Sequence, residues 1–382
     1  MKAKLYITLL VVLVFVHSAL PAQEKETGQK IIIGEKIRMY SEILGEWRPL
    51  EIYLPDDYEI SDKPYPVMLV LDGGWAFNYC VSIVDMMSPN YFPRMVVVGL
   101  PNTDRSRDLY PLYKVNDETE KGTANFLRFM HEELFPFLGK KFRIRDYRIL
   151  FGHSLAGYFS IYTLLKYPSL FNGYIATSPS LRMTENKALL SSLLGSVSPD
   201  EINGKFLYFS GGGEEGEELH MGIKTFDLLL KEKKIPGLTW SYDIFDGEGH
   251  VPVKGFYKGL RGLFHRWIPV LEFFRSGTLD DIKSHYRGLT EKYGFPVLPP
   301  IPIVNVVGRR YLREGKSRQA VDVYRYYVSL YPAYSSGYLA LSEAYILAKN
   351  QDSAVENLRK CLQLDPENSR AKKLLEDLQK KQ

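Results

Sequence analysis

A serine stands where a strand-like run of the sequence passes directly into a helix-like run. The apolar segment Tyr147–Phe151 leads into the sequence GHSLAG over Gly152–Gly157, and an amphipathic stretch follows. Ser154 is then at the apex of a nucleophile elbow, whose flanking residues must be small because the helix packs against the strand. The second small position holds Ala156 rather than the more usual glycine, and a methyl group should fit there. The alternative is a serine that only caps a helix.

An acid and a base follow later strand-like runs. A serine hydroxyl is a weak nucleophile that needs a base, and the base needs an acid to orient it. One run ends in Gly-Gly-Gly followed by Glu214 and Glu215, and a later one ends in Asp-Gly-Glu-Gly followed by His250. The order serine, acid, histidine is the one that accompanies this elbow. We expect His250 as the base and Glu214 as the acid, with Glu215 as its rival. The alternative for either glutamate is a solvated carboxylate in an acidic loop.

The loop after the strand-like run Val67–Leu71 has the sequence Asp-Gly-Gly-Trp, which ends at Trp75. A tetrahedral intermediate needs two N–H donors for its oxyanion. We expect one from Leu155, the residue after the serine, and the other from Gly74 or, second, from Trp75. The alternative is a plain turn, which Asp-Gly also indicates.

The elements that would position these residues alternate along the chain. Nearly continuous apolar runs, separated by helical patterns, predict a mostly parallel α/β sheet covered on both faces. The predicted strands are Leu50–Leu54, Val67–Leu71, Met95–Leu100, Tyr147–Phe151, Gly173–Thr177, Lys205–Ser210 and Thr239–Phe245. The predicted helices are Thr123–Leu138, Leu155–Lys166, Glu217–Lys231 and Gly255–Trp267.

The first residues are typical of a secretory signal peptide. Two lysines precede the apolar run Leu5–Val16, and small residues follow up to Ala22. That layout predicts cleavage after Ala22, and a run this short is less than the roughly 20 residues that a membrane anchor needs. We expect a periplasmic or secreted protein with two free, buried thiols at Cys80 and Cys361.

The C-terminal part has a different composition. Proline-rich residues 273–303 predict a semi-rigid connector after an enzyme domain spanning 23–272. From 304 to 382 the types at Gly308, Tyr311 and Ala320 recur 34 residues later, and this period resembles that of tetratricopeptide repeats. Two repeats are few, so we expect them to lean on the enzyme domain, on a protein partner or on a second copy.

With these residues in place, residues 37–267 resemble bacterial esterases of the α/β-hydrolase superfamily. This group includes siderophore (enterobactin-type), feruloyl, acetyl-xylan and esterase D-like enzymes. The resemblance is carried by LDG at 71–73, VGLPNTDRSRDL at 98–109, GHSL at 152–155, SPSL at 178–181 and EGH at 248–250. It implies an α/β-hydrolase fold with a small all-α repeat segment, and Ser154, Glu214 and His250 as nucleophile, acid and base.

We therefore expect an exported serine esterase that acts through an acyl-enzyme, on an ester of a siderophore or of a polysaccharide. Arg182 and Arg107 are candidate substrate-binding residues with Trp75, and an ion-pair cluster is the alternative for Arg107. The sequence implies no cofactor or metal, because it has neither clustered Cys/His spacing nor a dinucleotide fingerprint. A formal charge of +4 without long basic runs argues against nucleic acid. The alternatives are an acyltransferase with the same site and a binding scaffold whose repeats recruit a partner.

Overall fold

The computed structural model describes residues 31–110, 117–181, 183–250 and 252–380. The expected signal peptide, residues 1–22, lies outside this described part. Contacts separate the chain into Met1–Ile32 and one compact unit, Ile33–Gln382, to which the following description applies. In the described residues, no helix combines the length and apolar character that a membrane crossing requires.

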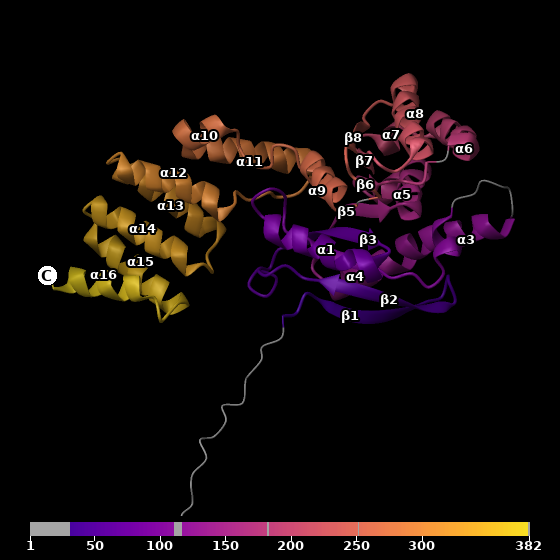
Figure 1. The fold of residues 1–382 in the computed structure, drawn as a ribbon. Helices are drawn as coiled ribbons and strands as arrows, with labels where there is room; N and C mark the ends of the chain where they lie inside the picture. Colours follow the sequence, from indigo (N-terminus) through magenta and orange to yellow (C-terminus); the bar gives the residue numbers. More distant parts are fainter. Residues whose placement is uncertain (1–30, 111–116, 182, 251, 381–382) are drawn as a thin grey trace, which may run out of the picture. The chain divides into compact units, whose positions relative to one another are not determined.

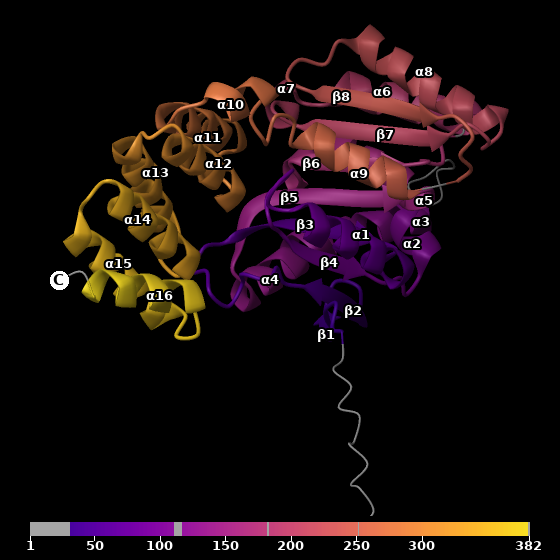
Figure 2. The same ribbon diagram turned by 60° about the vertical axis from the view of Figure 1, so that its left-hand side comes forward.

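Eight strands form one sheet in the order β1-β2-β4-β3-β5-β6-β7-β8 (Figures 1 and 2). Antiparallel pairing joins β1 to β2 and β2 to β4, whereas all pairs from β4 to β8 are parallel. The mostly parallel α/β fold predicted from the sequence is thus confirmed. The strands are β1 (Glu35–Ser41), β2 (Glu46–Tyr53), β3 (Tyr65–Leu71), β4 (Val96–Leu100), β5 (Ile144–His153), β6 (Gly173–Thr177), β7 (Phe206–Gly212) and β8 (Thr239–Phe245).

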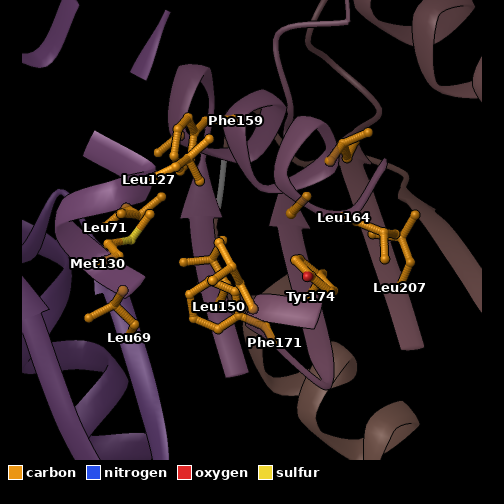
Figure 3. Close-up of a cluster of buried hydrophobic side chains, with 14 of the residues drawn as sticks. Leu69, Leu71, Leu127, Met130, Leu150, Phe159, Leu164, Phe171, Tyr174 and Leu207 are labelled. Carbon is orange, nitrogen blue, oxygen red and sulfur yellow. The ribbon is translucent and has the colours of Figure 1, made fainter. Parts of the chain in front are cut away.

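Helices cover both faces of the sheet, and the side chains of each strand alternate between two apolar clusters. In β3, Leu69 and Leu71 belong to one cluster, while Met68 and Val70 belong to the other. The first cluster lies under α5 and its neighbours, and Figure 3 shows Leu69 and Leu71 on the same side as Phe159. The helices of this part are α1 (Gly73–Met87), α2 (Arg105–Leu109), α3 (Asp117–Arg128), the π-helix Phe129–Leu134, α4 (Phe135–Lys141), α5 (Leu155–Lys166), the short 3₁₀ helix Pro168–Leu170, α6 (Met183–Ser196), α7 (Pro199–Ile202), α8 (Glu217–Lys233) and α9 (Pro252–Leu263).

Two elements near the N-terminus were not predicted from the sequence. β1 is an edge strand with mostly exposed side chains, so it lacks the apolar run that marks the inner strands. Helix α1 begins with two glycines and has no side-chain cap at its start. Its buried residues, among them Phe77, Val81 and Val84, do follow helical spacing, so this helix could have been predicted from the sequence.

The expectation of a semi-rigid connector at 273–303 is wrong over most of its length. The segment holds the end of α10 (Leu271–Ser276) and all of α11 (Leu279–Tyr293). A capping box between Thr278 and Asp281 starts α11, which buries Tyr286 and other side chains. A stretch without helix remains at 294–300, where glycine and prolines cannot continue one.

The C-terminal segment is all helical. Its helices are α12 (Ile301–Arg313), α13 (Ser317–Leu330), α14 (Ser335–Leu347), α15 (Gln351–Leu364) and α16 (Ser369–Gln379). Starts at 301, 335 and 369, and at 317 and 351, reproduce the 34-residue period of the sequence. The apolar cluster behind β3 continues from α1 and α9 through α11 into α12–α15. Cys80 and Cys361 are free and buried.

Candidate active site

Ser154 lies in the sharp turn between β5 and α5. Its φ of 58° and ψ of −118° are values that a non-glycine residue rarely adopts. The turn requires glycine at position 152, because a Cβ there would lie only 2.1 Å from the carbonyl oxygen of Ala156. The methyl group of Ala156 itself is accommodated in the buried core. The Ser154 N–H donates to the Thr177 carbonyl at 3.0 Å, which fixes the turn to the neighbouring strand β6.

Glu215, rather than Glu214, contacts the histidine. Its Oε1 atom lies 2.9 Å from Nδ1 of His250, and its side chain is 1% exposed. Glu214 is exposed. Its backbone N–H donates to the carbonyl of Glu248, so the turn directs its side chain outwards. The geometry therefore corrects our preferred acid and favours the rival that the sequence left open.

The two loops that carry Glu215 and His250 are locked together by their backbones. A Cβ on Gly212 would lie 1.9 Å from the carbonyl oxygen of Gly249, so only glycine allows this approach. The Gly213 N–H donates to the Phe245 carbonyl at 2.7 Å. Ser178 Oγ also donates to Glu215 Oε1, so the same carboxylate oxygen meets both the hydroxyl and the imidazole.

His153, the residue before Ser154, lies against the ring of His250. Its ring centroid lies 4.3 Å from that of His250 and 5.4 Å from that of Trp75. Burial, and then the neighbouring His250, lower the pKa of His153 to about 4. A neutral His153 can donate from Nδ1 to the Thr177 carbonyl, 3.1 Å away. This ring contact joins two loops that lie far apart in the sequence, so the residues around His153 do not indicate it.

The two expected oxyanion donors begin helices at the same edge of the sheet. Leu155 is the first residue of α5, and Gly74 is the second residue of α1. The first N–H groups of a helix have no acceptor within it, and the helix dipole favours negative charge there. A Cβ on Gly74 would meet no atom within 4 Å, so the space beside this N–H is open. Trp75 donates its N–H to the Asp72 carbonyl at 3.2 Å, which leaves Gly74 as the better donor.

The three residues expected to bind the substrate differ in their surroundings. Trp75 is half exposed beside His153. Arg107 contacts Glu46 and Asp108 at 2.8 Å each, in a cluster with the buried Arg48. The hydrogen bond from Arg107 is the main cause that lowers the pKa of Glu46 to about 2. These contacts favour the structural alternative for Arg107. Arg182 lies outside the described residues.

Two further residues lie together at this edge of the sheet. Asp72 and Arg105 form a bidentate ion pair beside α1, and both influence the pKa of His153. The described residues contain no cluster of three or more His, Cys, Asp or Glu side chains that could hold a metal ion.

Residues 41–212 match the family described as "Putative esterase". This esterase match includes the nucleophile elbow and ends just before the loop of Glu215. Ferri-bacillibactin esterase BesA of Bacillus subtilis is 31% identical over 141 residues, which are 35% of this chain and 47% of BesA. Together these two matches support an ester hydrolase at the level of the family.

Two solved structures support the fold. An IroE-like serine hydrolase from Shewanella oneidensis has a TM-score of 0.63 and 24% identity, over 75% of this chain and 96% of that one. A protein from Capnocytophaga ochracea has a TM-score of 0.62 and 18% identity, over 91% of this chain and 99% of that one. The second coverage is too large to leave out the C-terminal helices, so the fold likeness includes them.

Proposed function

We propose that this protein is a serine carboxylic ester hydrolase in which Ser154 is the nucleophile, His250 the base and Glu215 the acid. The observation that carries the proposal is the joint geometry of two loops. Ser154, in its strained elbow, directly follows His153, whose ring contacts the ring of His250. Nδ1 of His250 in turn lies 2.9 Å from Oε1 of the buried Glu215. A helix-capping serine would require neither the elbow nor this pair.

In the proposed reaction, His250 takes the proton of Ser154 as its Oγ attacks the ester carbonyl. The N–H groups of Leu155 and Gly74 stabilise the oxyanion, and Glu215 holds the imidazole in the required orientation. His250 then protonates the leaving alkoxide. It next activates water, which attacks the acyl-enzyme and releases the carboxylic acid product. No step requires a cofactor.

The substrate that we propose is an ester of a siderophore, because the relative BesA is named for that activity. A polysaccharide-linked ester remains the alternative from the sequence resemblance. Export to the periplasm or medium, through the signal at 1–22, would bring the enzyme to either substrate. We also propose that the C-terminal helices are tetratricopeptide-like repeats, supported by their 34-residue period, and that they stabilise the enzyme domain or bind a protein partner.

The test is hydrolysis of p-nitrophenyl esters from acetate to octanoate by the protein and by Ser154→Ala. We expect activity in the first and loss of at least about a thousandfold in the second, in line with the cost of removing a triad residue. A fluorophosphonate probe should label the native protein and not the variant. Activity that survives in Ser154→Ala, or a native serine that no ester or probe modifies, would refute the proposal.

A further inference from the structure

Asp72 occupies the position before α1 but does not cap the helix. An aspartate there usually accepts a hydrogen bond from the N–H of the second or third helical residue. Asp72 makes no such side-chain bond. Its backbone, with φ 54° and ψ 38°, is left-handed, whereas a capping residue is typically extended. The carboxylate therefore does not bind the N–H groups at the start of its own helix.

Three donors hold this carboxylate in place. Arg105 donates from Nε to Oδ1 at 2.8 Å and from Nη2 to Oδ2 at 2.9 Å. Asn102 donates from Nδ2 to Oδ1 at 2.5 Å. Asp72 is 2% exposed while the Arg105 side chain is 38% exposed, so the arginine reaches in from the surface to a buried acid.

The register of the sheet explains why these residues meet beside the nucleophile. Leu71 at the end of β3 pairs with Leu100 at the end of β4, so the loops with Asp72 and Arg105 leave the sheet side by side. On the other side, Val70 pairs with Phe151, two residues before His153. Asp72 and His153 therefore leave adjacent strands at the same level.

The N–H group of Gly74 near the start of α1 has two possible anionic acceptors. One is the substrate oxyanion, and the other is the carboxylate of Asp72, which is closest along the chain. A carboxylate that capped the helix would use the N–H of Gly74 or Trp75 and would place a negative charge where the oxyanion develops. Both effects oppose the transition state.

We propose that Arg105 is a positioning residue that holds the carboxylate of Asp72 away from the start of α1 and so keeps the Gly74 N–H available for the oxyanion. The idea rests on the proposed ester hydrolysis and adds a residue to its machinery. It gives the ion pair a role that a purely structural pair would not have. The distinguishing consequence is that removing Asp72 should repair the damage caused by removing Arg105.

The experiment compares Arg105→Met, Asp72→Gly and the double variant in the full-length protein. Glycine suits the left-handed backbone at position 72. We expect Arg105→Met to lower kcat about a hundredfold with little change in KM, which is the usual effect of losing one oxyanion donor. The double variant should recover at least tenfold in kcat over Arg105→Met. Arg105→Lys keeps the positive charge but cannot make both hydrogen bonds of the guanidinium. Its kcat should lie between that of Arg105→Met and that of the native protein.

Inhibition by an acyl trifluoromethyl ketone reports the oxyanion site directly, because attack by serine on this ketone forms an oxyanion. Its Ki should rise in Arg105→Met by about the same factor as kcat falls. The matched control is Arg94→Met, which removes an Arg–Asp pair of 2.9 Å at the opposite, amino end of the strands. That variant should keep kcat within about twofold.

A crystal structure of Arg105→Met tests the geometry without relying on activity. We expect an Asp72 carboxylate oxygen within hydrogen-bond distance of the N–H of Gly74 or Trp75. An unmoved carboxylate, an unchanged kcat in Arg105→Met, or a double variant no better than the single one would each overturn the inference. An inactive native protein with a capped helix in the variant would instead refute the proposed esterase and leave the structural part intact.

Discussion

Glu215 and His250 are joined at 2.9 Å between Oε1 and Nδ1, although the carboxylate is buried and the imidazole is half exposed. This asymmetry suits a base that must meet the substrate and an acid that must only orient the base. A second contact, from Ser178 Oγ, holds the Glu215 carboxylate in its buried position.

The adjacent glutamates offer a matched pair of variants. We expect Glu215→Gln to lower kcat on p-nitrophenyl acetate by about 10²- to 10⁴-fold, because the amide no longer stabilises the imidazolium. Glu214→Gln changes an exposed side chain and should keep kcat within about twofold. Steady-state kinetics at one pH decide between them, and the reverse ranking would return the acid role to Glu214.

The loop contact of Gly212 gives a prediction about geometry. In Gly212→Ala the new methyl would overlap the Gly249 carbonyl, so the loop must move and carry His250 away from Ser154. We expect kcat to fall about a hundredfold or more. Gly195→Ala is the control, because a Cβ at this helical position meets no atom within 4 Å. It should leave kcat unchanged, and equal activity of both variants would show that the loops are not tightly coupled.

The lowered pKa of His153, about 4, predicts a pH dependence of stability. The unfolded histidine titrates near 6.5, so between pH 6.5 and 4 the unfolded state binds more protons, and stability falls as pH falls. Over that window we expect His153 to contribute a loss of about 2–3 kcal/mol in the free energy of unfolding. Denaturant unfolding of the native protein and of His153→Asn at pH 7 and pH 4.5 measures it. The variant should show the smaller loss, and parallel losses would assign the effect to other groups.

Phe295 anchors the chain between α11 and α12 to the sheet. Its ring lies 5.1 Å from that of Tyr147 in β5 and under the guanidinium of Arg145. We expect Phe295→Ala to lower the free energy of unfolding by about 3–5 kcal/mol, because it leaves a cavity in a buried cluster. The exposed Leu271→Ala should cost less than about 0.5 kcal/mol. Similar midpoints in urea for the two variants would show that this stretch is only loosely attached.

The inner strands and helix α5 could be predicted from the sequence because their buried positions appear there as apolar runs. The bounds of β6, β8 and α5 agree with the predicted ranges. Ser154 and His250 follow from the same logic, since each comes after a strand in the required order. The pattern does not report φ angles, however, and so it could not show that Ser154 is strained.

Other features depend on contacts that the local sequence does not contain. The choice between Glu214 and Glu215 depends on the loop that carries His250, because this loop accepts the backbone N–H of Glu214 and contacts the side chain of Glu215. Helix α11 was missed because nearby prolines suggested a linker, although its capping box begins at Thr278. The pairing of Arg105 with Asp72 joins loops 33 residues apart and requires the sheet register.

The apolar cluster that begins behind β3 and continues into α15 has a thermodynamic consequence. A chain composed of an enzyme and a detachable repeat array would unfold in two separate transitions. Here the same buried side chains serve both segments, so loosening one exposes apolar surface of the other. Calorimetric unfolding should then give a single heat-absorption peak whose van't Hoff and calorimetric enthalpies agree. We therefore expect the described residues from Ile33 onwards to unfold as one cooperative unit, although the sequence predicts two domains.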